Sequence, residues 1–172
     1  MTVDLSKLPN KYFDLMNSGE ALAKEGKFEE AYEKFSKAVD ECEYIINFFM
    51  NKIADKTEDD KILEDLIIHQ IWEAKLVKAA FFKHMALYNQ KVKNADVHAK
   101  NELLICYGIQ LLGYKIISTI KTYVKKYRKK LHFIIPDMVD IIIENWNSRQ
   151  ELLEKMLLEE NIELPSLLPE TI

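Results

Sequence analysis

Glycine and proline are scarce in this chain, with four of each among its 172 residues. Both residues interrupt helices and strands and build the turns between them, so their scarcity predicts few, long elements. Hydrophobic residues make up 48% of the chain and charged residues 30%, a balance that excludes a disordered protein. At this length we expect one domain, residues 1–172, built from helices.

Cysteine is also scarce, and it is placed where a structural or redox role is not expected. Cys42 and Cys106 lie singly in apolar helical patterns, without C-x-x-C spacing, so we expect two small buried thiols. The first residues contain no apolar run of signal-peptide length, which predicts a cytoplasmic protein. The apolar run at 103–120 barely reaches spanning length and carries Gln110 and Lys115 near its middle. We interpret it as a buried central helix rather than a membrane span.

Catalytic motifs are missing as well. The sequence contains no glycine-rich phosphate loop, no G-x-S-x-G and no H-E-x-x-H. Asp65, His69 and Glu73 share one helix face at spacings that metal ligands use, but the paired E-x-x-H motifs of a di-metal bundle are absent. We interpret these three residues as a polar stripe with a pair along the helix. The sequence therefore predicts a non-enzymatic protein with no catalytic residue, no metal site and no cofactor.

What the chain does contain is helical periodicity, in five segments that each predict one helix. We divide the chain into an amino-terminal arm at 1–9, a helical hairpin at 10–56, long helices at 57–160 and a tail at 161–172. Asn10 is the expected N-cap of the first helix. The predicted fold class is all-α, a bundle of about five helices.

The third and fourth helices are the longest, each on the order of 50 Å if unbroken. The third should begin at a capping box of Thr57 and Asp60, and it is apolar over more than half of its circumference. Gly108 and Gly113 predict a kink or a close helix contact in the fourth helix. Pro136 should lie in the first turn of an amphipathic fifth helix.

Small and aromatic residues alternate in the hairpin with a recognisable spacing: Gly19, Leu22, Gly26, Phe28, Ala31, Phe35 and Ala38. This pattern resembles a tetratricopeptide repeat (TPR), a 34-residue helix-turn-helix unit, over about residues 12–45. Ser18 and Glu43 depart from that pattern, and no second copy follows. The same stretch is similar to the second helix of microtubule-interacting-and-transport (MIT) domains, which bind partner helices. Either resemblance implies a packed helical hairpin and a protein-binding function.

A basic segment stands out at residues 115–130, with seven basic residues and no acidic one. Its candidate nucleic-acid-binding residues are Lys121, Tyr123, Lys125, Lys126, Tyr127, Arg128, Lys129 and Lys130, because cations bind phosphates and tyrosines stack on bases. Two other interpretations remain open. Cations are favoured at a helix C-terminus, and residues 137–170 carry nine acids that could neutralise the segment. Arg128 and His132 are also similar to the R-x(4–6)-H motif of HEPN nucleases, with three residues between them.

The tail at 161–172 carries apolar residues around Pro165 and Pro169, which prevent a regular helix. It should lie in a groove of its own bundle or of a partner. The function predicted first is a protein–protein interaction or self-assembly module that binds a partner helix, a peptide or a second copy in a helical groove. A nucleic-acid-binding bundle is the alternative, and a membrane partner is not expected.

Overall fold

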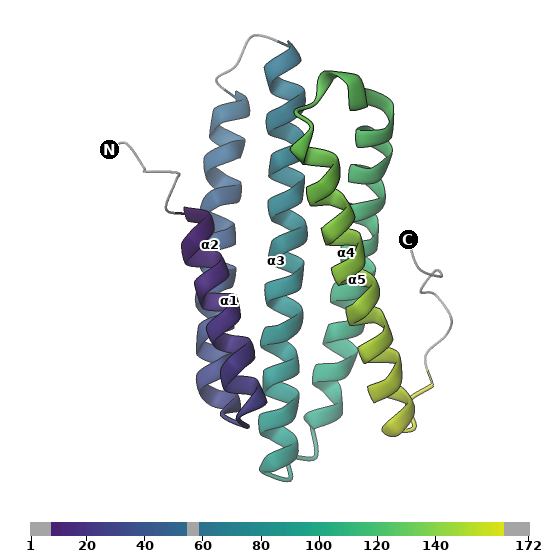
Figure 1. The fold of residues 1–172 in the computed structure, drawn as a ribbon. Coiled ribbons are helices and arrows are strands. Elements are labelled where there is room, and N and C mark those ends of the chain that lie inside the picture. The colour runs from purple at the N-terminus through teal and green to yellow at the C-terminus, as the bar shows by residue number, and fades with distance from the viewer. Residues whose placement is uncertain (1–7, 55–58, 164–172) are drawn as a thin grey trace.

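The computed structural model describes residues 8–54 and 59–163, which form five α-helices, one short 3-10 helix and no strand (Figure 1). Their bounds are α1 Leu8–Lys24, α2 Phe28–Ala54, α3 Asp59–Lys93, α4 Ala99–Tyr127, η1 Arg128–Lys130 and α5 Ile134–Glu159. The predicted all-α bundle is confirmed. The long third and fourth helices and Pro136 in the first turn of α5 are confirmed too.

Helix α3 lies at the centre of the bundle, between a hairpin of α1 and α2 and a hairpin of α4 and α5 (Figure 1). It packs against α2, α4 and α5, which explains why it is apolar over so much of its circumference. Helix α1 packs mainly on α2, and α5 mainly on α4, so these two outer helices hardly touch each other. A strip of α3 is therefore left uncovered between α1 and α5.

Three clusters of apolar side chains form the core. One joins α1 and α2 to α3 around Phe35, a second joins α3, α4 and α5 around Trp146, and a third fills the opposite end of the same three helices around Phe81. Cys42 and Cys106 are both buried in these clusters, as predicted.

Two glycines allow helices to approach closely. A Cβ atom on Gly113 would lie 2.9 Å from Val77 Cγ1 and 3.1 Å from Trp146 Cδ1, so α4 could not otherwise sit this close to α3 and α5. A Cβ atom on Gly19 would lie 2.6 Å from the ring of Phe35, at the α1–α2 contact. The close contact predicted in the fourth helix is thus present at Gly113. Gly108 makes no such contact, because nothing lies within 4 Å of the added atom.

Three helices end in a left-handed residue that closes the last turn. These residues are Gly26 (φ 78°) after α1, Ala95 (φ 53°) after α3 and Asn161 (φ 55°) after α5. In each case the next amide donates to a carbonyl five residues back, as in Asp96 N to Lys91 O at 2.8 Å, which is the Schellman pattern. Glycine is the usual residue here, so Ala95 carries backbone strain.

Some predicted details differ from the structure or lie outside the described residues. Asn10 is not an N-cap, since α1 begins at Leu8 and takes Asn10 into its first turn. Thr57 of the proposed capping box, and the tail from residue 164, lie outside the described residues. Ile162, at the start of that tail, packs against the cluster around Phe81.

The apolar run of the fourth helix is buried on one face only. Within the described residues, the stretch Ala99–Lys130 is the one long and apolar enough to cross a membrane, and 33% of its most apolar window is buried. A core helix of a bundle meets the same criterion of length and composition. Leu104, Ile105 and Leu112 point outward, so the predicted burial of this helix is correct for its inner face and wrong for its outer one.

Candidate functional site

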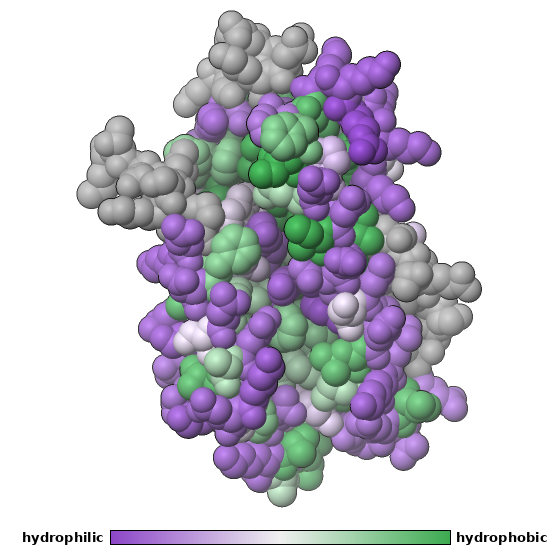
Figure 2. Space-filling model, viewed as in Figure 1, coloured by the Kyte–Doolittle hydropathy of each residue, from purple (hydrophilic) through white to green (hydrophobic). Residues whose placement is uncertain are grey.

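A groove follows the uncovered strip of α3 between α1 and α5, and it contains a cavity of about 220 Å³. Its apolar wall is made by Phe13 of α1 and by Met138, Ile141 and Ile142 of α5. Phe13 is 45% exposed and Ile141 58% exposed, which is unusual for large apolar side chains that face one another. In Figure 2, hydrophobic surface is visible in the hollow between the two hairpins, bordered by hydrophilic side chains.

The apolar wall follows from the sequence of α5. Met138, Ile141 and Asn145 recur at helical spacing and face the groove, while Val139 and Trp146 face the core. Helix α5 is thus apolar on two adjacent faces, and its neighbours cover only one of them. On the opposite side of the groove, Phe13 lies beside Tyr12, whose hydroxyl donates to the Lys75 carbonyl oxygen at 3.3 Å.

Three basic side chains line the same cavity: Lys75 and Lys78 from α3 and Arg149 from α5. Burial lowers the pKa of all three, and that of Arg149, which is 4% exposed, falls to about 10. The charge of Lys78 lowers the pKa of Lys75 further. For Lys78 the carboxylate of Glu20 opposes the effect of burial, and Arg149 adds to it. The cavity is therefore a site of concentrated positive charge.

The orientation of two of these cations is fixed by neighbours that carry no formal charge. The Lys75 ammonium lies 4.8 Å from the ring centre of Phe13 and within 5.6 Å of those of Tyr12 and Trp72. Arg149 donates from Nε to Gln110 Oε1 at 3.2 Å. Within the described ranges, no ion pair joins Lys75, Lys78 or Arg149 to a carboxylate.

A buried amide network holds Arg149 in place. Gln110 Nε2 donates to the Trp146 carbonyl and to Gln150 Oε1, each at 3.2 Å, and Trp146 Nε1 donates to the Gln110 carbonyl at 3.0 Å. This explains why the apolar run at 103–120 carries a glutamine near its middle. The network joins α4 to α5 and satisfies groups that would otherwise be costly to bury.

A second groove lies on the opposite side of α3, between α2 and α4. It contains a cavity of about 440 Å³ lined by Ile46, Leu76, Leu112 and Ile116, with two carboxylate side chains at its edge. This groove has no basic side chain in its lining. The two sides of α3 thus differ in charge, although both expose apolar side chains.

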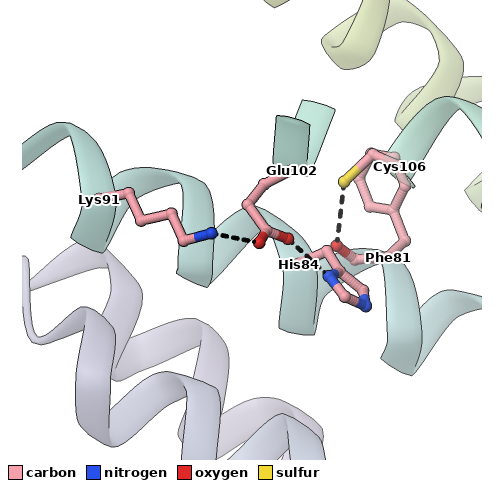
Figure 3. Close-up of polar contacts among 5 residues, drawn as sticks. All are labelled: Phe81, His84, Lys91, Glu102 and Cys106. Atoms are coloured by element: carbon pink, nitrogen blue, oxygen red, sulfur yellow. Dashed lines mark hydrogen bonds and ion pairs between the residues drawn. The ribbon is translucent and has the colours of Figure 1, made fainter. Parts of the chain in front are cut away.

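Near the turn between α3 and α4, a buried carboxylate has a complete set of partners (Figure 3). Glu102 Oε1 accepts from Lys91 Nζ, and Glu102 Oε2 contacts His84 Nδ1, each at 2.7 Å. Burial raises the pKa of Glu102, but the bonds from Lys91 and His84 outweigh it and leave the pKa below its usual value. The nearby Cys106 thiol lies 3.7 Å from the Phe81 carbonyl, and burial raises its pKa to about 12. This cluster secures the turn and keeps the thiol protonated.

The polar stripe predicted in the third helix is present. Lys52 of α2 donates to Asp65 at 3.3 Å, and His69 Nδ1 lies 3.5 Å from Glu73 Oε1. Asp65 therefore joins α3 to α2, and His69 and Glu73 form the pair along α3. The described part of the chain contains no group of three side chains placed to hold a metal ion.

The basic segment forms the end of α4 and η1, and none of its residues lines the groove. Its residues Lys121, Tyr123, Lys125, Lys126, Arg128, Lys129 and Lys130 are exposed, and Tyr127 is half-buried. Tyr123 and Tyr127 stack on each other, with ring centres 6.3 Å apart. Within residues 8–54 and 59–163, no ion pair links the acids of α5 to Lys121, Lys125, Lys126, Arg128 or Lys129. His132 stacks on Phe133 at 4.5 Å.

The sequence matches no protein-family model, no curated protein and no solved structure. The class of this protein therefore rests on its own geometry, an all-α bundle with grooves on both sides of a central helix. Of the groove residues, the three cations were not predicted as a site. The signal in the sequence is weak: Lys75 and Lys78 interrupt an otherwise apolar stretch of α3, and Arg149 is a basic residue in an acidic helix.

Proposed function

We propose that this protein is a non-enzymatic interaction module that binds a partner helix or peptide in the groove between α1 and α5. The observation that carries this proposal is the uncovered strip of α3 with Phe13 and Ile141 exposed on either side of a cavity. Amphipathic helices bind in such grooves by placing apolar anchors at helical spacing into pockets. A second copy of the chain could supply the helix, which would make the module self-assembling.

The hairpin of α1 and α2 supports the same proposal by resemblance. Its pattern of small and aromatic residues is similar to TPR and MIT hairpins, and both families bind protein segments. Gly19 against the ring of Phe35 is the close contact that such a pattern requires. The resemblance supports a protein partner without indicating which surface is used.

A displayed library of random 16-residue peptides tests the proposal, with two matched variants. Ile141→Arg places a long charged side chain in the groove. Leu158→Arg makes the same change on the same helix at a position that is 78% exposed and outside the cavity. We expect enriched peptides to form helices when bound, and to bind the native protein and Leu158→Arg equally. Their binding to Ile141→Arg should weaken by about tenfold or more, the loss expected of a blocked apolar anchor.

Two outcomes contradict the proposal. One is a library from which no helical peptide is enriched. The other is a set of peptides whose binding is equal in Ile141→Arg and Leu158→Arg, which would place the binding surface elsewhere. Sedimentation of the native protein and of Ile141→Arg shows whether a second copy associates and whether that association needs the groove.

A nucleic-acid-binding bundle is the second candidate function. It is favoured by the exposed basic segment, whose lysines 121, 125, 126 and 129 form no ion pair within the described ranges, and by the stacked Tyr123 and Tyr127. Fluorescence anisotropy with single-stranded RNA should show binding that weakens steeply with salt. A triple variant, Lys125→Glu, Lys126→Glu and Lys129→Glu, should abolish it.

The control for that triple variant makes the same change in net charge at positions outside the basic segment. Lys24, Lys37 and Lys93 are exposed on other helices, and their replacement by Glu should reduce binding far less. Equal losses in both triple variants would mean that only net charge matters, and would contradict a site at the basic segment.

A further inference from the structure

We propose that the cavity between α1, α3 and α5 binds a carboxylate on an apolar stem, so that the partner segment presents an acidic anchor residue to Lys75, Lys78 and Arg149. The inference rests on the proposed function for the carrier of the carboxylate, a peptide segment. The site itself follows from the cavity and its charges.

The first argument is the cost of these charges in the free protein. Arginine is almost never buried as deeply as Arg149 unless a carboxylate neutralises it. Within the described residues its hydrogen bond goes to an uncharged amide, and Lys75 and Lys78 line the same cavity without a carboxylate at ion-pair distance. Lys78 makes the charged form of Lys75 less favourable, and Arg149 does the same to Lys78. A bound anion would remove that repulsion, so the cavity is better suited to a filled state than to an empty one.

The second argument is the orientation of the donors. Lys75 is positioned by three aromatic rings, and Arg149 is held through Nε by Gln110. With Nε occupied, the two terminal Nη groups of Arg149 remain to grip a carboxylate end-on. Since this geometry is set before any ligand arrives, little ordering is needed on binding.

The third argument is the size and lining of the cavity, which select the ligand class. Pockets for drug-sized molecules measure roughly 300–1,000 Å³, and this cavity measures about 220 Å³. It suits one acidic side chain with an apolar neighbour. Met138, Ile141 and Ile142 would contact the stem, while the cations bind its charged end. A phosphate ion has no apolar stem to cover these three side chains, so the lining favours a carboxylate.

The test uses small probes that mimic a glutamate side chain. Butyrate carries the charge and the stem, butyramide carries the stem alone, and inorganic phosphate carries charge alone. Methyl groups of methionine and isoleucine in the full chain are labelled with carbon-13 and followed by NMR. We expect butyrate to cause saturable shifts at Met138, Ile141 and Ile142, with an affinity about 10- to 100-fold above that of butyramide, the value of a charge-assisted hydrogen bond. Phosphate should cause smaller shifts than butyrate.

A pair of variants separates the charge from the fold. Lys78→Met keeps the side-chain stem but removes one cation from the cavity. Lys83→Met makes the same change on the same helix outside the cavity lining, where the ammonium lies over Tyr32 at 5.5 Å. Lys78→Met should weaken butyrate binding by about tenfold, leave butyramide binding unchanged, and raise the melting temperature of the free protein. Lys83→Met should leave butyrate binding unchanged.

Several outcomes would overturn the inference. Equal binding of butyrate and butyramide, or unchanged butyrate binding in Lys78→Met, would show that the cations do not select the ligand. Phosphate binding tighter than butyrate would show an anion site with no need for an apolar stem. A lowered melting temperature in Lys78→Met would show that this cation stabilises the free protein.

These results are separable from the test of the proposed function. Some peptides could need the groove but bind equally well after their own Glu residues are replaced by Gln. That result would support the interaction module and contradict the acidic anchor. Butyrate selectivity without any enriched peptide would support the carboxylate site and contradict the peptide carrier.

Discussion

Replacing Gly113 by alanine should destabilise the bundle, although alanine is the better helix former. The added Cβ would meet Val77 Cγ1 at 2.9 Å and the Trp146 ring at 3.1 and 3.2 Å. Trp146 is 0% exposed, and its Nε1 bond to the Gln110 carbonyl holds the ring in place. Because the ring cannot move away without breaking that bond, we expect an overpacking cost of about 2–3 kcal/mol, the upper part of the usual range.

The helix-forming advantage of alanine offsets part of this cost. It is worth about 1 kcal/mol in a helix interior, so Gly113→Ala should lower the free energy of unfolding by about 1–2 kcal/mol net. Gly108→Ala provides the matched control, since it lies in the same helix with nothing within 4 Å of its added Cβ. There we expect a gain of about 0.5–1 kcal/mol.

Urea unfolding followed by circular dichroism at 222 nm measures both changes. The two variants should change the free energy of unfolding in opposite directions and differ by about 1.5–3 kcal/mol, which corresponds to several degrees in melting temperature for a chain of this length. Equal shifts of the same sign in both variants would refute the reasoning, because they would show that the contact of Gly113 with Val77 and Trp146 does not limit packing. A chain that loses cooperativity only on Gly113→Ala would agree with it.

Three further predictions concern the ends and polar contacts of α3. Ala95→Gly should raise the free energy of unfolding by about 0.5–1 kcal/mol, because glycine relieves the left-handed strain at φ 53°; an unchanged or lowered value in urea would contradict it. The pKa of Glu102 is lower in the folded protein than in the unfolded chain, where it is about 4.3, so its ion pairs stabilise the fold above about pH 4.3. This stabilisation is lost as the pH falls toward the lower pKa of the folded protein. Glu102→Gln should therefore cost about 1–3 kcal/mol at pH 7 and progressively less toward pH 3, and a pH-independent cost would argue against this origin. Tyr88 donates to Glu160 Oε1 at 2.6 Å, and burial and this bond raise the pKa of Tyr88 to about 12. Tyr88→Phe should lower the unfolding free energy by about 1 kcal/mol, and a neutral result would show that water replaces the bond.

The helices and most buried faces could be predicted from the sequence because they depend on local periodicity. Tyr12, Phe35 and Ile45 recur at helical spacing and are buried in the structure. Helix starts were harder to place: Asn10 is a good capping residue, but α1 begins at Leu8. A capping residue contributes less free energy than the burial of a whole helical face. The apolar face therefore determines where the helix lies, and its exact first residue is set less strongly.

The groove could not be predicted, because its parts come from helices that are distant in the sequence. The cavity depends on α1 and α5 standing apart on the same side of α3, which no local pattern encodes. In the sequence, nothing distinguishes Lys75 and Lys78 from other basic residues, and Arg149 is simply one cation in an acidic helix. The cluster of Glu102 with Lys91 and His84 was missed for the same reason, since it forms only when α4 folds back on α3.

The sparse contact between α1 and α3 also bears on how the groove can change width. Helix α1 is held mainly by α2, so a small outward shift of α1 would disturb the cluster around Phe35 and leave those around Trp146 and Phe81 intact. Besides α2, the wall carrying Phe13 is held by the contacts of Tyr12 with Lys75 and Trp72 of α3. Local opening of this wall should need less free energy than global unfolding, and amides of α1 should exchange with solvent faster than those of α3. A protein built this way can admit side chains of different sizes without loosening the helices that carry Arg149.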